Sequence, residues 1–227
     1  MPATWDWEYA WEITPDLIEG MVAIVVATVL GMIVAVILGL FLALGRRSDN
    51  KWVSYPVAWF IEFVRSTPLL VQLFFLFYAL PQITFLPRAI STMSPLVTLV
   101  VALGVHYGCY CSEAYRAGIN SVPRGQWEAS TALNLKSSTK WRNVILPQAI
   151  PRALPPLGNY FVAMFKDAPQ GSAITYAGVL FVARALQSAD FRTVEPFTIA
   201  GILFLMVSIP AAMAVRRLER RVAYESD

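Results

Sequence analysis

Histidine and cysteine are scarce in this 227-residue chain, which holds only His106, Cys109 and Cys111. A metal centre built from several such ligands, or a Ser-His-Asp triad, is therefore not expected. The two cysteines lie two residues apart in an apolar run, at a spacing that does not easily form a disulfide. We interpret them as small packing residues rather than as metal or redox groups. The sequence predicts neither a catalytic nor a metal site.

Charge is scarce too, since 15% of the residues are charged and 57% are hydrophobic. Soluble domains have about 25% charged and about 45–50% apolar residues, so the composition indicates an integral membrane protein. No Gly-Lys dipeptide is present, which excludes the phosphate-binding loop G-x-x-x-x-G-K-[ST]. The acidic, aromatic N-terminus lacks the basic start of a cleavable signal peptide, so the first span is expected to direct insertion. The net charge of +3 is modest, and no nucleic acid partner is expected.

Five apolar stretches are long enough to be considered as membrane spans, each of which needs roughly 20 residues. They are residues 21–44, 57–80, 96–111 with a continuation to 115, 155–182, and 196–215. An all-α protein with five transmembrane helices is therefore expected. Residues 1–20 are predicted to precede the membrane domain, residues 21–220 to form it, and residues 221–227 to form a tail.

The basic residues predict the orientation of these spans. Most lie after the first, third and fifth stretches: Arg46, Arg47, Lys51, Arg116, Arg124, Lys136, Lys140, Arg142, Arg152, Arg216, Arg217, Arg220 and Arg221. The other side holds Arg88, Arg184 and Arg192 with Asp6, Glu8, Glu12, Asp16 and Glu19. Because Lys and Arg are enriched in cytoplasmic loops, the N-terminus is expected outside and the tail in the cytoplasm.

Aromatic residues alternate near the N-terminus: Trp5, Trp7, Tyr9 and Trp11. They are typical of an interfacial helix or strand, and an aromatic cage that binds a ligand is the alternative.

Small residues recur at every fourth position of the first stretch: Gly31, Ala35, Gly39 and Ala43. Such a stripe on one helix face lets a second helix approach closely. We expect structural packing there.

The second stretch contains polar groups that are costly inside a membrane. Glu62 and Arg65 lie one helical turn apart and can pair. Ser66 and Thr67 precede Pro68, which removes a backbone donor and predicts a kink whose free carbonyls the hydroxyls can satisfy. Gln72 follows one turn later. Two readings stay open: a charge pair at the headgroup boundary, or a gate on a solute pathway.

The third and fourth stretches add His106, Lys166 and Asp167 as solute-pathway candidates. Pro169 and Gly171 follow the Lys-Asp pair, so a broken helix that lines a water-filled cavity is expected there. The alternative is a short helix that ends at Lys166 before an external loop. His106 suits a hydrogen-bonded packing role better than solute contact or a pH switch. The predicted pathway residues are Glu62, Arg65, Ser66, Thr67, Gln72, His106, Lys166 and Asp167.

A polar segment, EASTALNLKSSTKWRNVILP at residues 128–147, separates the third and fourth stretches. It predicts a short helix over residues 125–133, a turn at Asn134, and a second helix from residue 137. Pro147 and Pro151 mark the return to the membrane. Physical reasoning alone leaves two possibilities, a helix lying on the surface or one seated in a groove of a partner.

This segment resembles the EAA loop of ABC-importer permeases, which reads Glu-Ala-Ala, three residues, Gly, nine residues, Ile-x-Leu-Pro. Glu128, Ala129, Leu146 and Pro147 match those positions, while Ser130 replaces Ala, Asn134 replaces Gly and Val144 replaces Ile. Residues 124–147 are then a cytoplasmic coupling loop that docks on an ATPase. The resemblance implies a coupling role for Glu128, Ala129, Ser130, Ala132, Leu133, Asn134, Leu146 and Pro147.

Other segments are similar to the polar amino-acid subfamily, among them EFVRSTPLLVQLFFLFYALP and VILPQAIPRALPPLGNYFVAMFKD. The surroundings of NSVPRGQWEASTALNL look most similar to ectoine and hydroxyectoine permeases. The chain departs from the family at residues 168–171, Ala-Pro-Gln-Gly, where Thr-Ser-Leu is usual. If this segment shapes the solute cavity, the solute can differ from that of related permeases.

The resemblance implies a type I ABC importer permease in a bacterial inner membrane. Its expected partners are a cytoplasmic ATPase dimer, which holds ATP and Mg, an extracytoplasmic solute-binding protein, membrane lipid, and a second permease subunit, either a sister chain or a copy. No cofactor is expected on this chain. Ectoine, glutamine, glutamate, arginine and histidine stay open as solutes. The alternatives are an ATP-independent secondary transporter or channel for small zwitterions, and a membrane scaffold.

Overall fold

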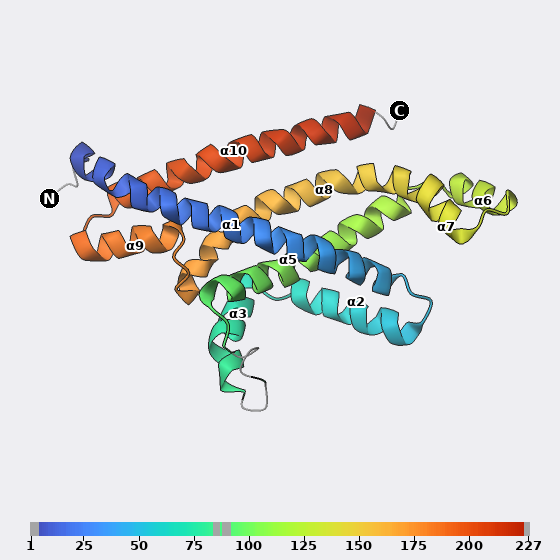
Figure 1. Ribbon diagram of the computed structural model, residues 1–227, viewed down its shortest axis with the longest axis horizontal. Helices are drawn as coiled ribbons and strands as arrows, with labels where there is room; N and C mark the ends of the chain where they lie inside the picture. The colour runs from blue at the N-terminus through green and yellow to red at the C-terminus, as the bar shows by residue number, and fades with distance from the viewer. Residues whose placement is uncertain (1–4, 84–86, 88–91, 225–227) are drawn as a thin grey trace.

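The computed structural model describes residues 5–83, 87 and 92–224, and this part of the chain is helical with short connections (Figure 1). Arg88, expected on the outer side, and residues 225–227 of the predicted tail lie outside the described residues. Four long helices run along the molecule: α1 (Trp7–Arg46), α5 (Pro95–Asn120), α8 (Leu146–Asp167) and α10 (Val194–Tyr224). The shorter helices are α2 (Lys51–Arg65), α3 (Leu69–Phe74), α6 (Arg124–Ala132), α7 (Ser137–Thr139) and α9 (Val179–Asp190). The prediction of an all-α fold is confirmed.

Helix α1 is one continuous helix of 40 residues that includes most of the segment predicted to precede the membrane. It begins because the Asp6 carboxylate accepts the free backbone N–H groups of Glu8 and Tyr9 at 3.1 and 3.2 Å. At about 1.5 Å per residue, α1 is about twice as long as the hydrocarbon core is thick. One end of α1 must therefore project from the membrane.

The small-residue stripe of α1 packs against α5, as the sequence predicts. Gly31, Ala35, Gly39 and Ala43 are all buried. A Cβ atom on Gly39 would lie 2.7 Å from the Cβ atom of Cys111 and 2.8 Å from the carbonyl oxygen of Gly108. Cys109 and Cys111 are free and buried, in keeping with a packing role. Helices α1 and α5 consequently form a closely packed pair.

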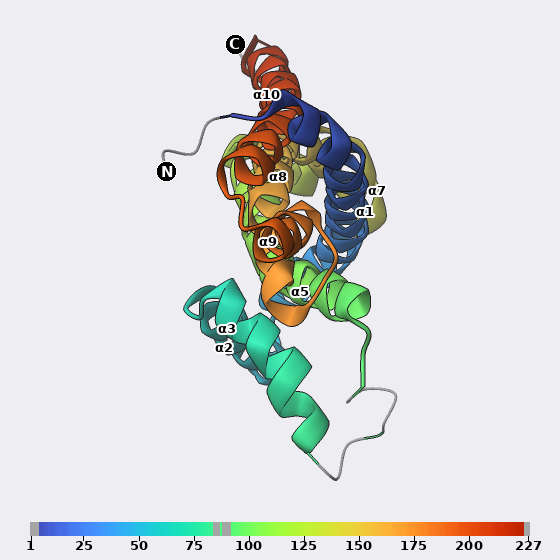
Figure 2. The ribbon, with the colours of Figure 1, turned by 90° about the vertical axis from the view of Figure 1, so that its left-hand side faces the viewer.

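The second apolar stretch is broken where the sequence predicts a kink. Helix α2 ends at Arg65, α3 begins at Leu69, and the two are bent by 102°. Pro68 stands at the N-cap of α3, where its missing N–H costs no helical hydrogen bond. Helix α3 continues as a π turn (Phe75–Ala79) and a 3-10 turn (Leu80–Gln82). Figure 2 shows this arm projecting from the remaining helices.

The fourth apolar stretch is not one helix. Helix α8 ends at Asp167 and is followed by a 3-10 helix (Ala168–Ile174), a left-handed Thr175 with φ of 60°, and α9. Gly171 suits the 3-10 helix because a Cβ atom there would lie 2.7 Å from a methyl group of the buried Leu99. The predicted break at the Lys-Asp pair is confirmed.

Length and composition support fewer membrane spans than the five that the sequence predicts. In the described chain, α1, α5 and α10 are long and apolar enough to cross a membrane. The bent pair α2 and α3 would make a fourth. A fifth span through α8 stays a prediction.

Candidate coupling and solute sites

The polar loop forms α6, a turn, α7 and a π turn (Lys140–Ile145) that leads directly into α8. Asn134 ends α6 in the left-handed conformation that the sequence predicts, with φ of 49°. Its N–H and that of Leu135 donate to the carbonyl oxygens of Thr131 and Ser130 at 2.9 and 3.1 Å. The loop lies at the opposite end of the molecule from α9 and the start of α1 (Figure 1).

The residues of α6 divide into an exposed and an inner set. Glu128, Ala129, Ala132 and Leu133 are exposed, and Leu133 is 72% exposed. Ser130 is 3% exposed, and its hydroxyl donates to the carbonyl oxygen of Gln126 at 2.6 Å. The Ser130 hydroxyl therefore lies away from the exposed face. The Glu128 carboxylate, the two alanines and Leu133 together form a small, partly apolar surface that contacts no other side chain by a hydrogen bond or ion pair in the described chain.

The inner side of α6 is braced by two tryptophans. The rings of Trp127 and Trp141 meet edge to face, with centroids 5.4 Å apart. Both pack on a buried cluster of Ile119, Val122, Ile145 and Ala149. Leu146 and Pro147 are exposed at the start of α8, where proline is tolerated. The loop is thus held against the ends of α5 and α8.

The bend between α2 and α3 is stabilised by polar side chains. The Thr67 hydroxyl lies 3.1 Å from the carbonyl oxygens of both Phe63 and Val64. Gln72 Nε2 donates to the Val64 carbonyl and to Thr67 Oγ1, both at 2.8 Å. Because Nε2 is used in this way, Gln72 Oε1 accepts from His106 Nδ1 at 3.2 Å. This bond fixes the imidazole tautomer and joins the bend to α5.

Asp167 anchors a second polar group between α5 and the break after α8. Tyr107 OH donates to Asp167 Oδ2 at 2.7 Å, and Gln170 Nε2 lies 3.3 Å from Oδ1. Tyr107 lies beside His106, whose ring centroid is 5.5 Å away. With Tyr107 and Gln170 as donors, the Asp167 carboxylate can still accept further hydrogen bonds.

Arg65 extends the polar region along α5 and α8. Its Cζ atom lies 5.1 Å from the ring centroid of Tyr110, which is 5.6 Å from that of Tyr160 on α8. The Arg65 side chain lies 3.6 Å from a Glu62 oxygen, so the predicted pair is present but long. The Arg65 guanidinium, which lies over the ring of Tyr110, and the Asp167 carboxylate, which accepts from Tyr107, thus both contact α5.

The structure gathers some predicted pathway residues and leaves others apart. Arg65, Thr67, Gln72, His106 and Asp167 belong to the contacts above. Ser66 is exposed, and the Glu62 side chain is 63% exposed. Lys166 is exposed and forms no ion pair with Asp167 in the described chain, and its place in the solute pathway stays a prediction. Consecutive helical residues point about 100° apart, which separates the two side chains.

Sequence reasoning did not select Tyr107, Tyr110, Tyr160 or Gln170 as site residues. Tyrosine within an apolar span also suits core packing and a membrane interface. The available signal was spacing, because Tyr107 and Tyr110 lie one turn apart beside His106 and Tyr160 precedes Asp167 by two turns. Within the described residues, no group of His, Cys, Asp and Glu could hold a metal ion.

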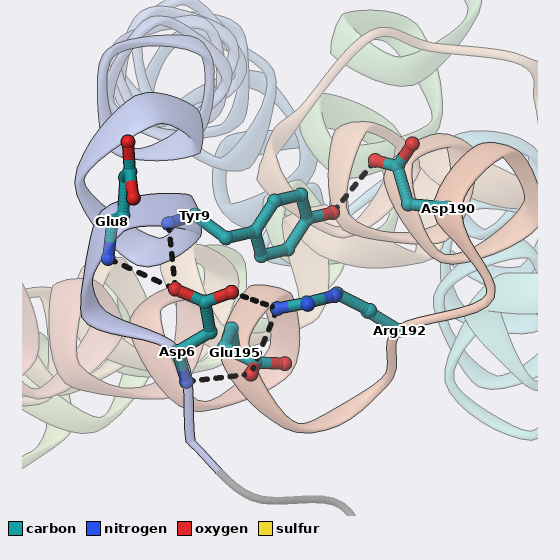
Figure 3. Close-up of polar contacts among 6 residues, drawn as sticks. All are labelled: Asp6, Glu8, Tyr9, Asp190, Arg192 and Glu195. Carbon is teal, nitrogen blue, oxygen red and sulfur yellow. Dashed lines mark hydrogen bonds and ion pairs between the residues drawn. The ribbon is translucent and has the colours of Figure 1, made fainter.

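A polar clamp ties the start of α1 to the turn between α9 and α10 (Figure 3). Arg192 donates to Asp6 Oδ2 at 2.8 Å and lies 3.7 Å from Glu195 Oε1. Asp6 N–H donates to the buried Glu195 at 3.1 Å. Tyr9 OH donates to Asp190 Oδ2 at 2.8 Å, and the Arg192 guanidinium lies 4.8 Å from the Tyr9 ring centroid. The clamp fixes the end of the molecule opposite the polar loop.

The clamp predicts a local effect of acid. The backbone N–H of Tyr9 and the Arg192 guanidinium hold the pKa of Asp6 below its usual 3.8. A lowered pKa in the folded state adds stability that is present above pH 3.8 and is lost as the pH falls through the lowered value. We expect amide hydrogen exchange of the first turn of α1 to become faster below that pH, after correction for intrinsic exchange.

Asp6→Asn tests this effect, because it should give the fast exchange already at neutral pH. Asp16→Asn is the matched control, since Asp16 is exposed on the same helix and has no polar side-chain partner in the described chain. Equal protection of the first turn in Asp6→Asn and the unmodified chain would contradict the role of the clamp.

Comparison with known proteins identifies the family. Residues 35–224 match the family described as binding-protein-dependent transport system inner membrane component. The chain belongs to this family. It is 39% identical over 218 residues to a probable amino-acid ABC transporter permease, y4tG, of Sinorhizobium fredii, with 94% of this chain and 92% of that protein covered. It is 34% identical over 218 residues to the glutamine transport system permease GlnP of Escherichia coli, with 96% and 97% covered.

Solved structures agree with the fold. A crystal structure described as an amino acid ABC transporter with histidines matches with a TM-score of 0.88 and 32% identity, over 96% of this chain and 100% of that one. An inward-facing structure of the MetNI methionine ABC transporter matches with a TM-score of 0.70 and 18% identity, over 96% and 99%, and shows the fold alone. The type I ABC permease fold is confirmed. Since the relatives are permeases, the chain is a transport subunit rather than an enzyme, and a partner hydrolyses ATP.

Proposed function

We propose that this chain is the permease subunit of an ATP-driven importer that takes a polar amino acid, or ectoine or hydroxyectoine, from an extracytoplasmic binding protein. The exposed face of α6 carries this proposal, since Glu128 and Ala129 stand at EAA positions and, with the exposed Ala132 and Leu133, have no side-chain partner in the described chain. An ATPase dimer would dock there. ATP-driven closure of that dimer would then displace α6 and open the solute pathway by rigid-body movement.

The polar groups along α5 support a zwitterionic solute. Asp167 can accept further hydrogen bonds from an ammonium or amidinium group, because its oxygens have acceptor capacity beyond Tyr107 and Gln170. Arg65 offers a guanidinium whose contact with Glu62 is long, and it can bind a carboxylate in its place. The names of the relatives favour an amino acid, and a cyclic zwitterion such as ectoine carries the same two charges.

The distribution of charge supports an orientation with the N-terminus outside. The end of the molecule that holds α6 carries Arg46, Arg47, Arg124, Lys136 and Lys140, whereas the clamp end holds Asp6, Glu8, Glu12, Asp16 and Glu19. Lys and Arg favour the cytoplasm. We place α6 in the cytoplasm and the clamp outside a bacterial inner membrane. A second permease subunit, either a copy or a sister chain, would complete the pathway.

Uptake of labelled solutes tests the solute class. The complete complex is reconstituted in liposomes with ATP inside and binding protein outside, and ectoine is compared with glutamine, glutamate, arginine and histidine. Uptake of one amino acid with no uptake of ectoine would restrict the proposal to amino acids. Ectoine uptake would instead restrict the proposal to ectoine and hydroxyectoine, and transport of none of these zwitterions would contradict the proposed class. A channel or secondary transporter would take up solute equally without ATP.

A further inference from the structure

Arg47 joins three segments at the end of the molecule that holds α6. It is the C-cap residue of α1. One of its guanidinium nitrogens, Nη1, donates to Oδ1 of Asn120, the last residue of α5, at 2.9 Å. Its Cζ atom lies 5.7 Å from the ring centroid of Trp141, in the turn that leads into α8. One side chain thus contacts both the closely packed pair of long helices and the polar loop.

Trp141 continues this contact to α6. Its ring meets that of Trp127 at 5.4 Å, and Trp127 directly precedes Glu128 in the sequence. The two rings pack on the buried side chains of Val122 and Ile145, so they lie on the inner side of the loop. A continuous path of contacts therefore runs from the exposed α6 face through two indole rings to the Arg47 guanidinium.

This path reaches the long helix that the loop does not join covalently. Helix α5 is joined to α6 by a turn of three residues, and α8 follows the π turn directly. Helix α1 has no such connection. It would follow a movement of α6 through its packing on α5 and through Arg47.

We propose that Arg47 is a positioning residue that fixes the polar loop to α1 and α5, so that these helices follow α6 when the ATPase moves it. The inference rests on the proposed function, since it requires an ATPase on α6. The planar guanidinium can stack on an indole ring and donate a hydrogen bond within its plane at the same time, which a lysine ammonium cannot do. The neighbouring Arg46 makes no side-chain hydrogen bond, ion pair or ring contact in the described chain.

Distance measurements between α1 and α6 test the inference in the complete complex with its ATPase, in lipid nanodiscs. Spin labels are placed through Phe41→Cys on α1 and Gly125→Cys on α6, which are exposed positions, while Cys109 and Cys111 are free and buried. Distances are compared without nucleotide and with ATP and vanadate, and ATP hydrolysis is measured in parallel.

We expect the unmodified complex to keep one narrow α1–α6 distance in both states. Arg47→Ala should broaden the distribution or shift it between the states, while ATP hydrolysis stays within about twofold. The equilibrium between the coupled and uncoupled arrangements of α1 and α6 should shift by roughly 2- to 30-fold toward the uncoupled one. Arg46→Ala, which removes the same charge at the same boundary, should behave like the unmodified chain.

The outcomes separate the inference from the proposed function. If the α1–α6 distances in Arg47→Ala equalled those of the unmodified complex, with the ATPase bound, the inference would be overturned and the proposed function would not. If the unmodified chain retained no ATPase, the proposed function would fail and the inference with it. If Arg47→Ala does not assemble, Arg47→Lys and Trp141→Leu replace it, and unmodified distances in both would overturn the inference.

Discussion

Glu128→Lys is expected to abolish solute transport while the protein still inserts into the membrane. Glu128 lies on the exposed face of α6 and its side chain has no hydrogen bond or ion pair in the described chain, so folding does not depend on its carboxylate. In the proposed complex, this carboxylate would be buried against the ATPase. Disrupting a buried charged contact costs about 2–5 kcal/mol, which corresponds to roughly 30-fold or more in affinity. The measurements are ATP-dependent uptake and the amount of ATPase that copurifies.

Two further variants separate docking from a general effect of charge. Glu128→Gln should retain part of the activity, since it keeps the shape and loses only the charge. Gln126→Lys adds a positive charge to the same helix one turn before the inward-facing Ser130, and it should transport normally. Full transport by Glu128→Lys would contradict the assignment of this face to coupling.

Asp167→Asn is expected to raise the KM for uptake by roughly 10- to 150-fold. The reason is that a hydrogen bond to a charged group contributes about 1.5–3 kcal/mol. The asparagine side chain keeps an acceptor for Tyr107 OH, so the contact between α5 and α8 should survive. The loss should therefore fall on a cationic group of the solute rather than on folding. Uptake is measured over a range of solute concentrations delivered by the binding protein.

Asp190→Asn is the matched control for Asp167→Asn. Asp190 also accepts a tyrosine hydroxyl, that of Tyr9 at 2.8 Å, but it belongs to the clamp at one end of the molecule. Its substitution should leave the KM unchanged. An unchanged KM in Asp167→Asn, with normal expression, would remove Asp167 from the solute pathway.

Local backbone chemistry explains what the sequence predicted well. Pro68 lacks a donor, so the break between α2 and α3 and its repair by Thr67 follow from the order of residues. Asn134 tolerates the left-handed conformation and ends α6 for that reason. The four-residue spacing of Gly31, Ala35 and Gly39 places them on one face, where close packing follows.

Contacts that depend on the relative placement of two helices were not predictable in this way. The hydrogen bond from Tyr107 to Asp167 needs the register of α5 against α8, and the residues are 60 positions apart. The inward direction of Ser130 depends on how the tryptophan pair sets the rotation of α6. The non-glycine residues Thr175 and Phe191 adopt positive φ angles, of 60° and 54°, so no glycine or asparagine marked these two turns in the sequence.

ATP dependence of uptake distinguishes an ATP-driven importer from a channel or secondary transporter. The complete complex is placed in liposomes with binding protein outside, and uptake of the solute that the panel identifies is compared with ATP, with a non-hydrolysable analogue and without nucleotide inside. We expect accumulation above the external concentration with ATP alone, and loss of this accumulation in Glu128→Lys. Equal uptake in all three conditions would contradict it and favour a channel or secondary transporter.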